Sequence, residues 1–100
     1  MSLSTHVLNA VTGQPAEGVP VRLERAGAVV AEARTDADGR VRDLGALEPG
    51  AHRLTFDTAA VFPHGFYPEV GISFTVADPA AHHHVPLLLS PFAYSTYRGS

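Results

Sequence analysis

The residues best suited to chemistry lie near the end of the chain. Three adjacent histidines, His82, His83 and His84, precede a Val-Pro pair and a run of leucines, and the chain then carries Tyr97-Arg98-Gly99-Ser100. Imidazole titrates near neutral pH, and arginine presents a permanently charged fork of hydrogen-bond donors. We therefore expect a terminal strand to carry a histidine into a site, with the last tetrapeptide beside it.

Two polar residues earlier in the chain are weaker candidates. His6 shares one face of an alternating segment with Leu8, and Arg40 directly follows the turn formed by residues 36–39, Asp-Ala-Asp-Gly. Asp suits such a turn because its carboxylate accepts from nearby backbone N–H groups, and glycine tolerates positive φ. Taken alone, a strand histidine is more often structural and an arginine after a turn is usually solvated.

The histidine cluster does not predict a metal site. Short His-rich tracts bind metals, but adjacent strand residues point to opposite faces, so only His82 and His84 can share an ion. They lack an obvious third ligand, and the chain has no cysteine to supply a thiolate. We expect no metal here, with His82 supporting the site or lying at a subunit edge, and His52 and His64 on the surface.

The elements that must position these residues are short strands at roughly ten-residue spacing, typical of an antiparallel β-sandwich. The pattern predicts seven or eight strands and one short helix over 57–62, which Asp57 would cap. The cleanest alternation, over 70–76, predicts a central strand. The expected strands cover residues 4–10, 19–24, 29–35, 41–44, 51–56, 70–76 and 82–90. A further terminal strand is expected to bring residues 98–100 beside the histidine strand.

Length and composition limit the function classes. One hundred residues suffice for a single domain, residues 1–100. The net charge of −3, with seven arginines and no clustering of them with aromatic residues, makes nucleic acid an unexpected partner. No segment approaches a membrane span, and the absence of cysteine and of a signal-like start favours the cytoplasm. The low charged fraction of 17% and a terminal strand that is apolar on both faces favour an oligomer.

Particular motifs resemble a known family. Residues 12–56 carry Gly-x-Pro-Ala-x-Gly-Val-x-Val-x-Leu, Thr-Asp-Ala-Asp-Gly-Arg and Leu-x-Pro-Gly-Ala-His-x-Leu, a pattern similar to prealbumin-like (transthyretin-like) sandwich modules in general. More specific are Leu-Ser-Thr-His-Val-Leu at 3–8, His-x-His-Val-Pro-Leu-Leu-Leu-Ser-Pro at 82–91 and the tetrapeptide at 97–100. Together they resemble the transthyretin-related 5-hydroxyisourate hydrolases.

This resemblance implies a homotetramer of β-sandwiches with active sites where two dimers meet. It implies hydrolysis of 5-hydroxyisourate to 2-oxo-4-hydroxy-4-carboxy-5-ureidoimidazoline in urate degradation, with no metal or organic cofactor. The catalytic positions of the family correspond to His6, Arg40 and His84, and its substrate-binding tetrapeptide to residues 97–100. We expect the two histidines to handle protons and the arginines to hold the substrate and stabilise developing charge.

Two departures and one alternative accompany the resemblance. His83 stands where a tyrosine is more usual, and the segment 62–67 is a few residues shorter than expected. The alternative is a non-catalytic transthyretin-like module that binds a small ligand in its channel. Two histidines and two arginines converging on such a channel would have no use in a carrier, so the sequence favours the hydrolase.

Overall fold

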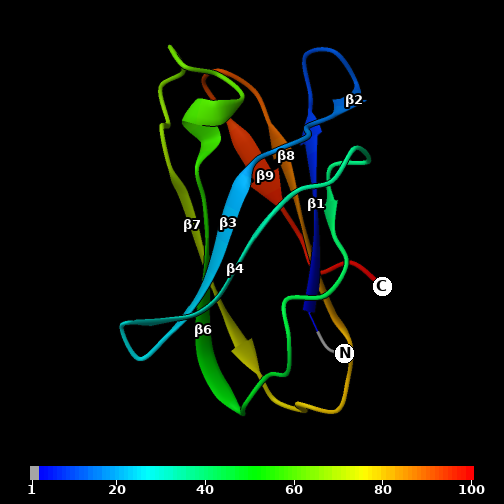
Figure 1. Ribbon diagram of the computed structural model, residues 1–100, viewed down its shortest axis with the longest axis vertical. Helices are drawn as coiled ribbons and strands as arrows, with labels where there is room; N and C mark the ends of the chain where they lie inside the picture. The colour runs from blue at the N-terminus through cyan, green and yellow to red at the C-terminus, as the bar shows by residue number, and fades with distance from the viewer. Residues whose placement is uncertain (1–2) are drawn as a thin grey trace.

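The computed structural model describes residues 3–100 as two β-sheets packed face to face, with one short 3-10 helix (Figure 1). This confirms the expected all-β sandwich. The elements are β1 Leu3–Asn9, β2 Gln14–Pro15, β3 Pro20–Arg25, β4 Ala28–Arg34, β5 Arg40–Val41, β6 Gly50–Phe56, η1 Thr58–Ala60, β7 Val70–Val76, β8 His83–Leu89 and β9 Tyr94–Thr96.

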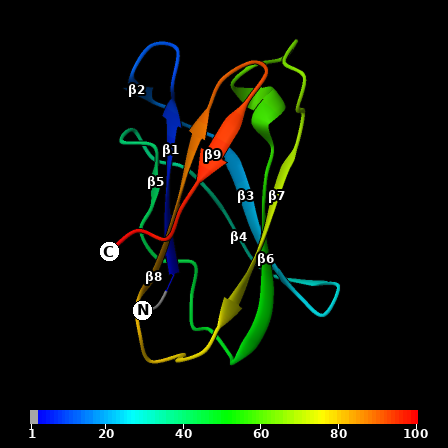
Figure 2. The same cartoon turned by 180° about the vertical axis from the view of Figure 1, so that it is seen from behind.

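The first sheet brings the two ends of the chain together. Its strands follow the order β2-β1-β8-β9, and β5 also pairs with β1. Figure 2 shows β8 lying between β1 and β9. The pairing of β1 with β8 is parallel, whereas the sequence predicts a purely antiparallel arrangement. Alternation reports which face of a strand is buried, and it carries no information on the direction of the neighbouring strand.

The second sheet has the order β4-β3-β6-β7, with antiparallel pairing throughout. The strand at 70–76 is therefore an edge strand of the sheet, and the prediction of a central strand is wrong. Its alternation arises because Val70 and Val76 are buried while Ser73 and Thr75 are exposed. A strand with one face packed on the core shows that pattern whether it has neighbouring strands on both sides or on only one.

The core lies between the sheets and consists of the inward residues of both. In β1, Leu3, Thr5 and Val7 are fully buried, while Ser4 and His6 on the opposite face are only half-buried. The second sheet contributes Leu54 and Phe56, neither of which is exposed at all. Period-two alternation thus fixes which side chains of β1 enter the core and which remain available on the outer face.

Three local predictions need correction. The helix expected over 57–62 is a single 3-10 turn, and Asp57 makes no side-chain capping bond. The strand expected over 41–44 is only Arg40–Val41. His52, expected on the surface, is 4% exposed because its ring stacks on Phe74, with centroids 5.7 Å apart. Exposed His64 agrees with expectation.

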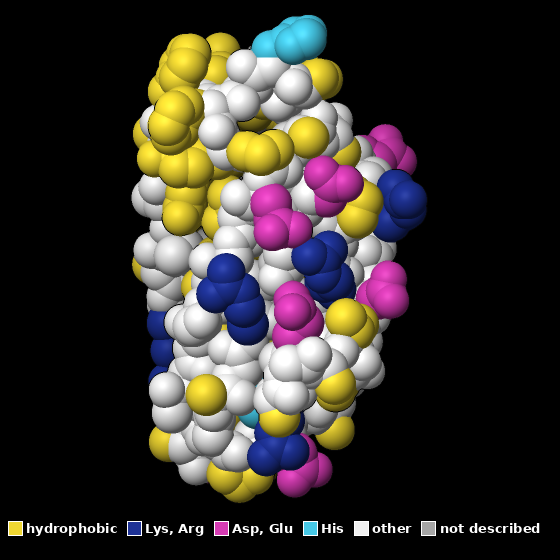
Figure 3. Space-filling model, turned by 90° about the vertical axis from the view of Figure 1, so that its left-hand side faces the viewer, with side chains coloured by type: hydrophobic (Ala, Val, Ile, Leu, Met, Phe, Trp, Pro, Cys, Tyr) yellow, Lys and Arg dark blue, Asp and Glu magenta, His cyan; other side chains and the backbone are white. Residues whose placement is uncertain are grey.

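One end of the molecule carries exposed aromatic side chains. The rings of Phe66, Tyr67 and Tyr94 form successive edge-to-face contacts, and Phe92 is 75% exposed. Figure 3 shows hydrophobic side chains gathered toward one end of the face on the β7 side, with acidic and basic groups farther along. Among the described residues 3–100, no helix is long and apolar enough to cross a membrane.

Candidate active site

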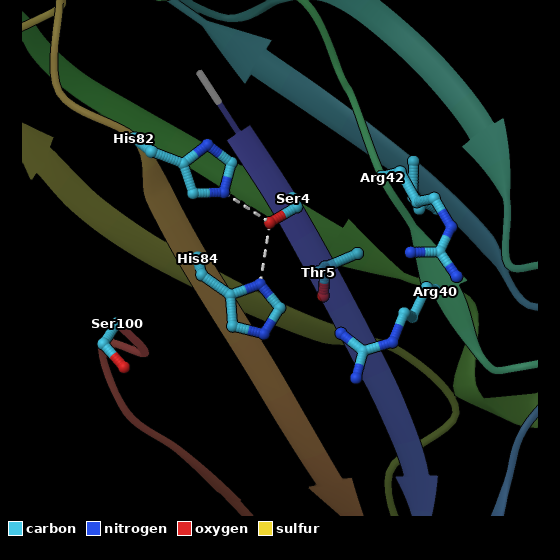
Figure 4. Close-up of a pocket in the computed structure, with 8 residues that line it drawn as sticks. Ser4, Thr5, Arg40, Arg42, His82, His84 and Ser100 are labelled. Carbon is cyan, nitrogen blue, oxygen red and sulfur yellow. Dashed lines mark hydrogen bonds between the residues drawn. The ribbon is translucent and has the colours of Figure 1, made fainter. Parts of the chain in front are cut away.

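The first candidate site is an open pocket of about 230 Å³ on the outer face of the first sheet (Figure 4). Its walls come from the two paired chain-terminal strands, from β5 and from the last residue. Because β1 pairs in parallel with β8, Ser4 stands directly beside His84. The lining residues are Ser4, Thr5, Arg40, Val41, Arg42, His82, His84 and Ser100.

His84 is the central imidazole of this pocket. Its Nδ1 lies 2.8 Å from the Ser4 Oγ, and its Nε2 makes no hydrogen bond with any residue from Leu3 to Ser100. The ring is half-buried on β8, two strand positions from His82, which projects from the same side (Figure 4). The site therefore offers one ring nitrogen of His84 to a ligand and fixes the other.

The surroundings of His84 favour its neutral form. Burial of the ring is the main reason that its pKa lies below the usual value of 6.5, and the positive charges of Arg40, His6 and His82 act in the same direction. An interaction with the Ser4 backbone, the smallest influence, acts in the opposite direction. At neutral pH the imidazole is therefore uncharged and has a lone pair available for a proton.

Arg40 reaches the pocket because a tight turn fixes its backbone. The carboxylate of Asp36 accepts from the backbone N–H groups of Asp38 and Arg40 at 2.9 and 3.0 Å. These two hydrogen bonds hold the pKa of Asp36 below its usual value, and the one from the Arg40 N–H has the larger effect. Gly39 has φ +73°, and a Cβ there would come within 2.4 Å of the Val7 carbonyl oxygen. Glycine is thus required where the turn crosses β1.

The charges of the turn leave one guanidinium unpaired. Arg42 lies 3.6 Å from the Asp36 carboxylate and 3.3 Å from that of Asp38. Arg40 makes no ion pair or side-chain hydrogen bond with any residue from Leu3 to Ser100, and its side chain extends toward His84 in Figure 4. An unneutralised cation is therefore available in the pocket for a polar or anionic ligand.

His6 lies beside this pocket without lining it. Its Cα is paired with that of Arg40 across the β1–β5 ladder. The ring Nε2 is 2.8 Å from the Asp38 carbonyl oxygen. A carbonyl only accepts, so Nε2 must carry a proton, and in the neutral ring the lone pair is on Nδ1. His6 is thus tied to the same turn that positions Arg40.

The last four residues divide between two places. The Gly99 N–H donates to the His84 carbonyl at 2.8 Å, and Ser100 lines the pocket. Tyr97 and Arg98 instead line a second groove of about 220 Å³ between β7 and the end of the first sheet. Within one chain, Gly99 and Ser100 therefore accompany His84, whereas Tyr97 and Arg98 do not.

Ser4 holds a position that sequence reasoning did not assign to the site, whereas His82 supports the site as one of its two expected roles. The Ser4 Oγ lies 2.9 Å from the His82 Nε2 and also contacts His84. The signal was available, since Ser4 is two residues before His6 and so shares its strand face. Among residues 3–100, no cluster of three His, Asp or Glu groups suited to a metal is present.

The two departures from the family pattern lie away from the pocket. His83 is buried on the opposite face of β8, with its Nδ1 2.9 Å from the Ala81 carbonyl oxygen. The shortened segment contacts the far end of β8, where the Phe66 N–H donates to Pro91 at 2.7 Å. Pro91 is seven positions beyond His84, and strand β8 covers the first five of these, a span of about 17 Å.

A sequence model described as the HIUase/Transthyretin family matches residues 3–99. The chain belongs to this family. Among curated members, a 5-hydroxyisourate hydrolase of Caulobacter vibrioides is 43% identical, over 98% of this chain and 97% of its own length. A uric acid degradation bifunctional protein of Arabidopsis thaliana is 44% identical, and the alignment spans 98% of this chain but only 37% of that protein.

Solved members of the HIUase/Transthyretin family share the fold. The structure of Klebsiella pneumoniae 5-hydroxyisourate hydrolase is 40% identical with a TM-score of 0.90, covering 100% of both chains. Sea bream transthyretin in complex with thyroxine is 30% identical with a TM-score of 0.88, covering 99% of this chain and 95% of its own. The fold is therefore common to a hydrolase and to a thyroxine-binding protein, and function must be argued from the site.

Proposed function

We propose that this protein hydrolyses 5-hydroxyisourate to 2-oxo-4-hydroxy-4-carboxy-5-ureidoimidazoline in urate degradation. The observation that carries the proposal is the pocket that joins a neutral His84, an unpaired Arg40 and Ser100 on one sheet face. Relatives named 5-hydroxyisourate hydrolase, such as that of Caulobacter vibrioides, align over nearly the whole chain. The absence of cysteine leads us to propose the cytoplasm as the compartment.

In the proposed reaction, water attacks a ring carbonyl of the substrate. A new C–O bond forms, the ring C–N bond breaks, and one proton of the water finally resides on the leaving nitrogen. The Nε2 of His84 is the proposed base, since it is unpaired within residues 3–100 and the pKa of the ring is depressed. A neutral imidazole can accept the water proton and return it to the leaving group.

Arg40 is the proposed oxyanion stabiliser. Attack on the carbonyl transfers negative charge to its oxygen, and a preorganised cation stabilises that charge more in the transition state than in the ground state. The turn held by Asp36 positions Arg40 before substrate arrives. Arg42, by contrast, is already engaged with Asp36 and Asp38.

The remaining proposed roles concern orientation of substrate and water. His6 has its Nε2 bound to the Asp38 carbonyl, which leaves Nδ1 to exchange protons at the border of the site. The Ser100 hydroxyl and the Gly99 backbone are proposed to bind substrate beside His84. For Tyr97 and Arg98, the same role requires a neighbouring subunit or a movement of the tail, because their side chains line the second groove.

We propose that the working form is a homotetramer assembled as a dimer of dimers. Support comes from the open edge strands β7 and β9 and from the exposed aromatic side chains, with Phe66 68% and Phe92 75% exposed. Unpaired strand edges and apolar patches of this kind are normally covered by another chain.

The alternative is a non-catalytic module that binds a small ligand, as the fold is shared with thyroxine-bound sea bream transthyretin. The character of the pocket disfavours it. An apolar hormone-like ligand would leave the charged and hydrogen-bonding groups of the pocket desolvated and unpaired. These groups belong to Ser4, Arg40, His82, His84 and Ser100.

The deciding experiment generates 5-hydroxyisourate in place with urate oxidase and follows its absorbance with and without the purified protein, in the presence of a chelator. Loss of the intermediate faster than its spontaneous decay, in proportion to protein, is expected. Decay at the spontaneous rate in the presence of a folded, assembled protein would contradict the hydrolase and direct attention to ligand binding.

A further inference from the structure

The hydroxyl of Ser4 bridges two imidazole rings. Its Oγ lies 2.9 Å from the His82 Nε2 and 2.8 Å from the His84 Nδ1 (Figure 4). A serine hydroxyl has one proton to donate and two lone pairs to accept. It can therefore donate to only one of the two rings, and the direction of that donation determines which nitrogen of His84 carries the proton.

We infer that Ser4 is a positioning residue that, together with His82, sets the tautomer of His84 for catalysis. In this arrangement His84 donates its Nδ1–H to the Ser4 Oγ, and the Ser4 hydroxyl donates to the His82 Nε2. The Nε2 of His84 then carries a lone pair toward the pocket. This inference rests on the proposed hydrolase function, because only a base at His84 requires that tautomer.

The opposite direction of donation in these two hydrogen bonds would disable the site. If Ser4 donated to the His84 Nδ1, the proton of the neutral ring would be on Nε2, which could not then take one from water. An acceptor at His82 is what draws the Ser4 proton away from His84. His82 is exposed, so solvent hydrates that end of the hydrogen-bond chain.

The backbone holds the three groups in place. Ser4 and His84 are paired positions in the parallel β1–β8 ladder, and Leu3 pairs with His83 beside them. The neighbouring Thr5 is buried, with its hydroxyl donating to the Val85 carbonyl at 2.6 Å. The Ser4 hydroxyl therefore lies on a well-ordered, hydrogen-bonded part of the sheet. From there it can orient the His84 imidazole without itself touching the reacting atoms.

The test compares Ser4→Ala with Ser4→Thr, and His82→Leu with His82→Gln. Thr keeps the hydroxyl, and Gln provides an amide oxygen that can accept in place of the His82 Nε2. We expect Ser4→Ala and His82→Leu to lower kcat by about tenfold each, as loss of one hydrogen bond would, with little change in KM. Ser4→Thr and His82→Gln should remain within about threefold of the parent.

A direct measurement of the tautomer accompanies the kinetics. Nitrogen-15 spectra of ring-labelled protein, recorded well above the usual histidine pKa, distinguish protonated from unprotonated ring nitrogens, and His84→Asn assigns the signals. The parent should show His84 protonated on Nδ1, and Ser4→Ala should show a mixture of both tautomers. Kinetic loss without a tautomer change would reduce Ser4 to a structural residue and overturn the inference.

The same data separate this inference from the proposed function. A parent protein without turnover contradicts the hydrolase, whatever the tautomer of His84. An active parent with His84 protonated on Nε2, or with Ser4→Ala turning over at the parent rate, contradicts the tautomer inference and leaves the hydrolase intact.

Discussion

Gly99 packs directly against the imidazole of His84. Its N–H donates to the His84 carbonyl at 2.8 Å, and a Cβ at position 99 would come within 2.5 Å of the ring Cδ2. Such a separation is far shorter than a normal carbon contact of about 3.5–4 Å. The tail and the ring therefore fit together only because residue 99 has no side chain.

Gly99→Ala is consequently expected to displace the His84 ring or the tail and to lower kcat by about tenfold or more, since small misplacements of catalytic groups are costly. Thermal stability should change little, because the affected segment is at the exposed end of the chain. Turnover and thermal unfolding, measured together, test this. Unchanged turnover would mean that the tail moves without disturbing His84.

His84→Asn should lower turnover by about a hundredfold or more if His84 is the general base, because that is the usual contribution of such a group. Its assembly, measured by sedimentation, should match the parent. The exposed His64 lies outside the pocket, so His64→Asn serves as the control and should be fully active. Unfolding of His84→Asn would identify the residue as structural.

Arg40→Gln should raise the pKa of His84 toward 6.5, because the Arg40 charge is one cause of its depression. The rise should be incomplete, since burial, the largest cause, remains. An NMR titration of the ring checks this.

In the parent, kcat/KM should hold through neutral pH and fall only below pH 6.5 as His84 is protonated. Because the folded pKa is lowered, fold stability should also decline in that acid range.

Gly39→Ala should destabilise the fold through the turn that carries Arg40. The position has φ +73° and a Cβ would meet the Val7 carbonyl oxygen at 2.4 Å. Positive φ alone costs about 1–2 kcal/mol, and the collision adds to this. Gly27→Ala is the matched control, since its φ is +79° but nothing lies within 4 Å of the added atom. A melting temperature equal to that of Gly27→Ala would show that the backbone of β1 moves aside with no loss of stability, and would contradict this prediction.

Phe92→Ser should weaken the proposed tetramer. The ring is 75% exposed in one chain, and loss of a central aromatic anchor from an interface typically costs about 2 kcal/mol or more. Val29→Ser, at a residue 48% exposed on β4, is the control. Sedimentation over a range of concentrations should show dissociation only for Phe92→Ser. Equal assembly of the two variants would place Phe92 outside the interface.

The sequence predicts most strands because their alternation reports burial directly. It identifies β1 and β8 and the turn before Arg40 from local chemistry alone. It does not predict that 70–76 is an edge strand, that β1 and β8 run parallel, or that His52 is buried against Phe74. Each of these depends on a partner distant in the chain, which a local pattern cannot specify.

The candidate site follows the same division. The motifs point to His84, Arg40 and Ser100, which the structure brings into one pocket. The Ser4 bridge depends on the register of two strands, and the separation of Arg98 from the pocket depends on the course of the tail. Neither can be obtained from residue spacing within a single segment.

The parallel pairing of β1 with β8 also determines when the pocket can exist. Thr5 and Val85, joined by a hydrogen bond, are 80 positions apart, whereas β3–β4 and β6–β7 pair locally. During synthesis the hairpins of the second sheet can therefore form early, while β1 must wait for β8 to emerge from the ribosome. A growing chain therefore cannot form this pocket before β8 and the residues up to Ser100 have been made, and the proposed activity cannot precede their synthesis.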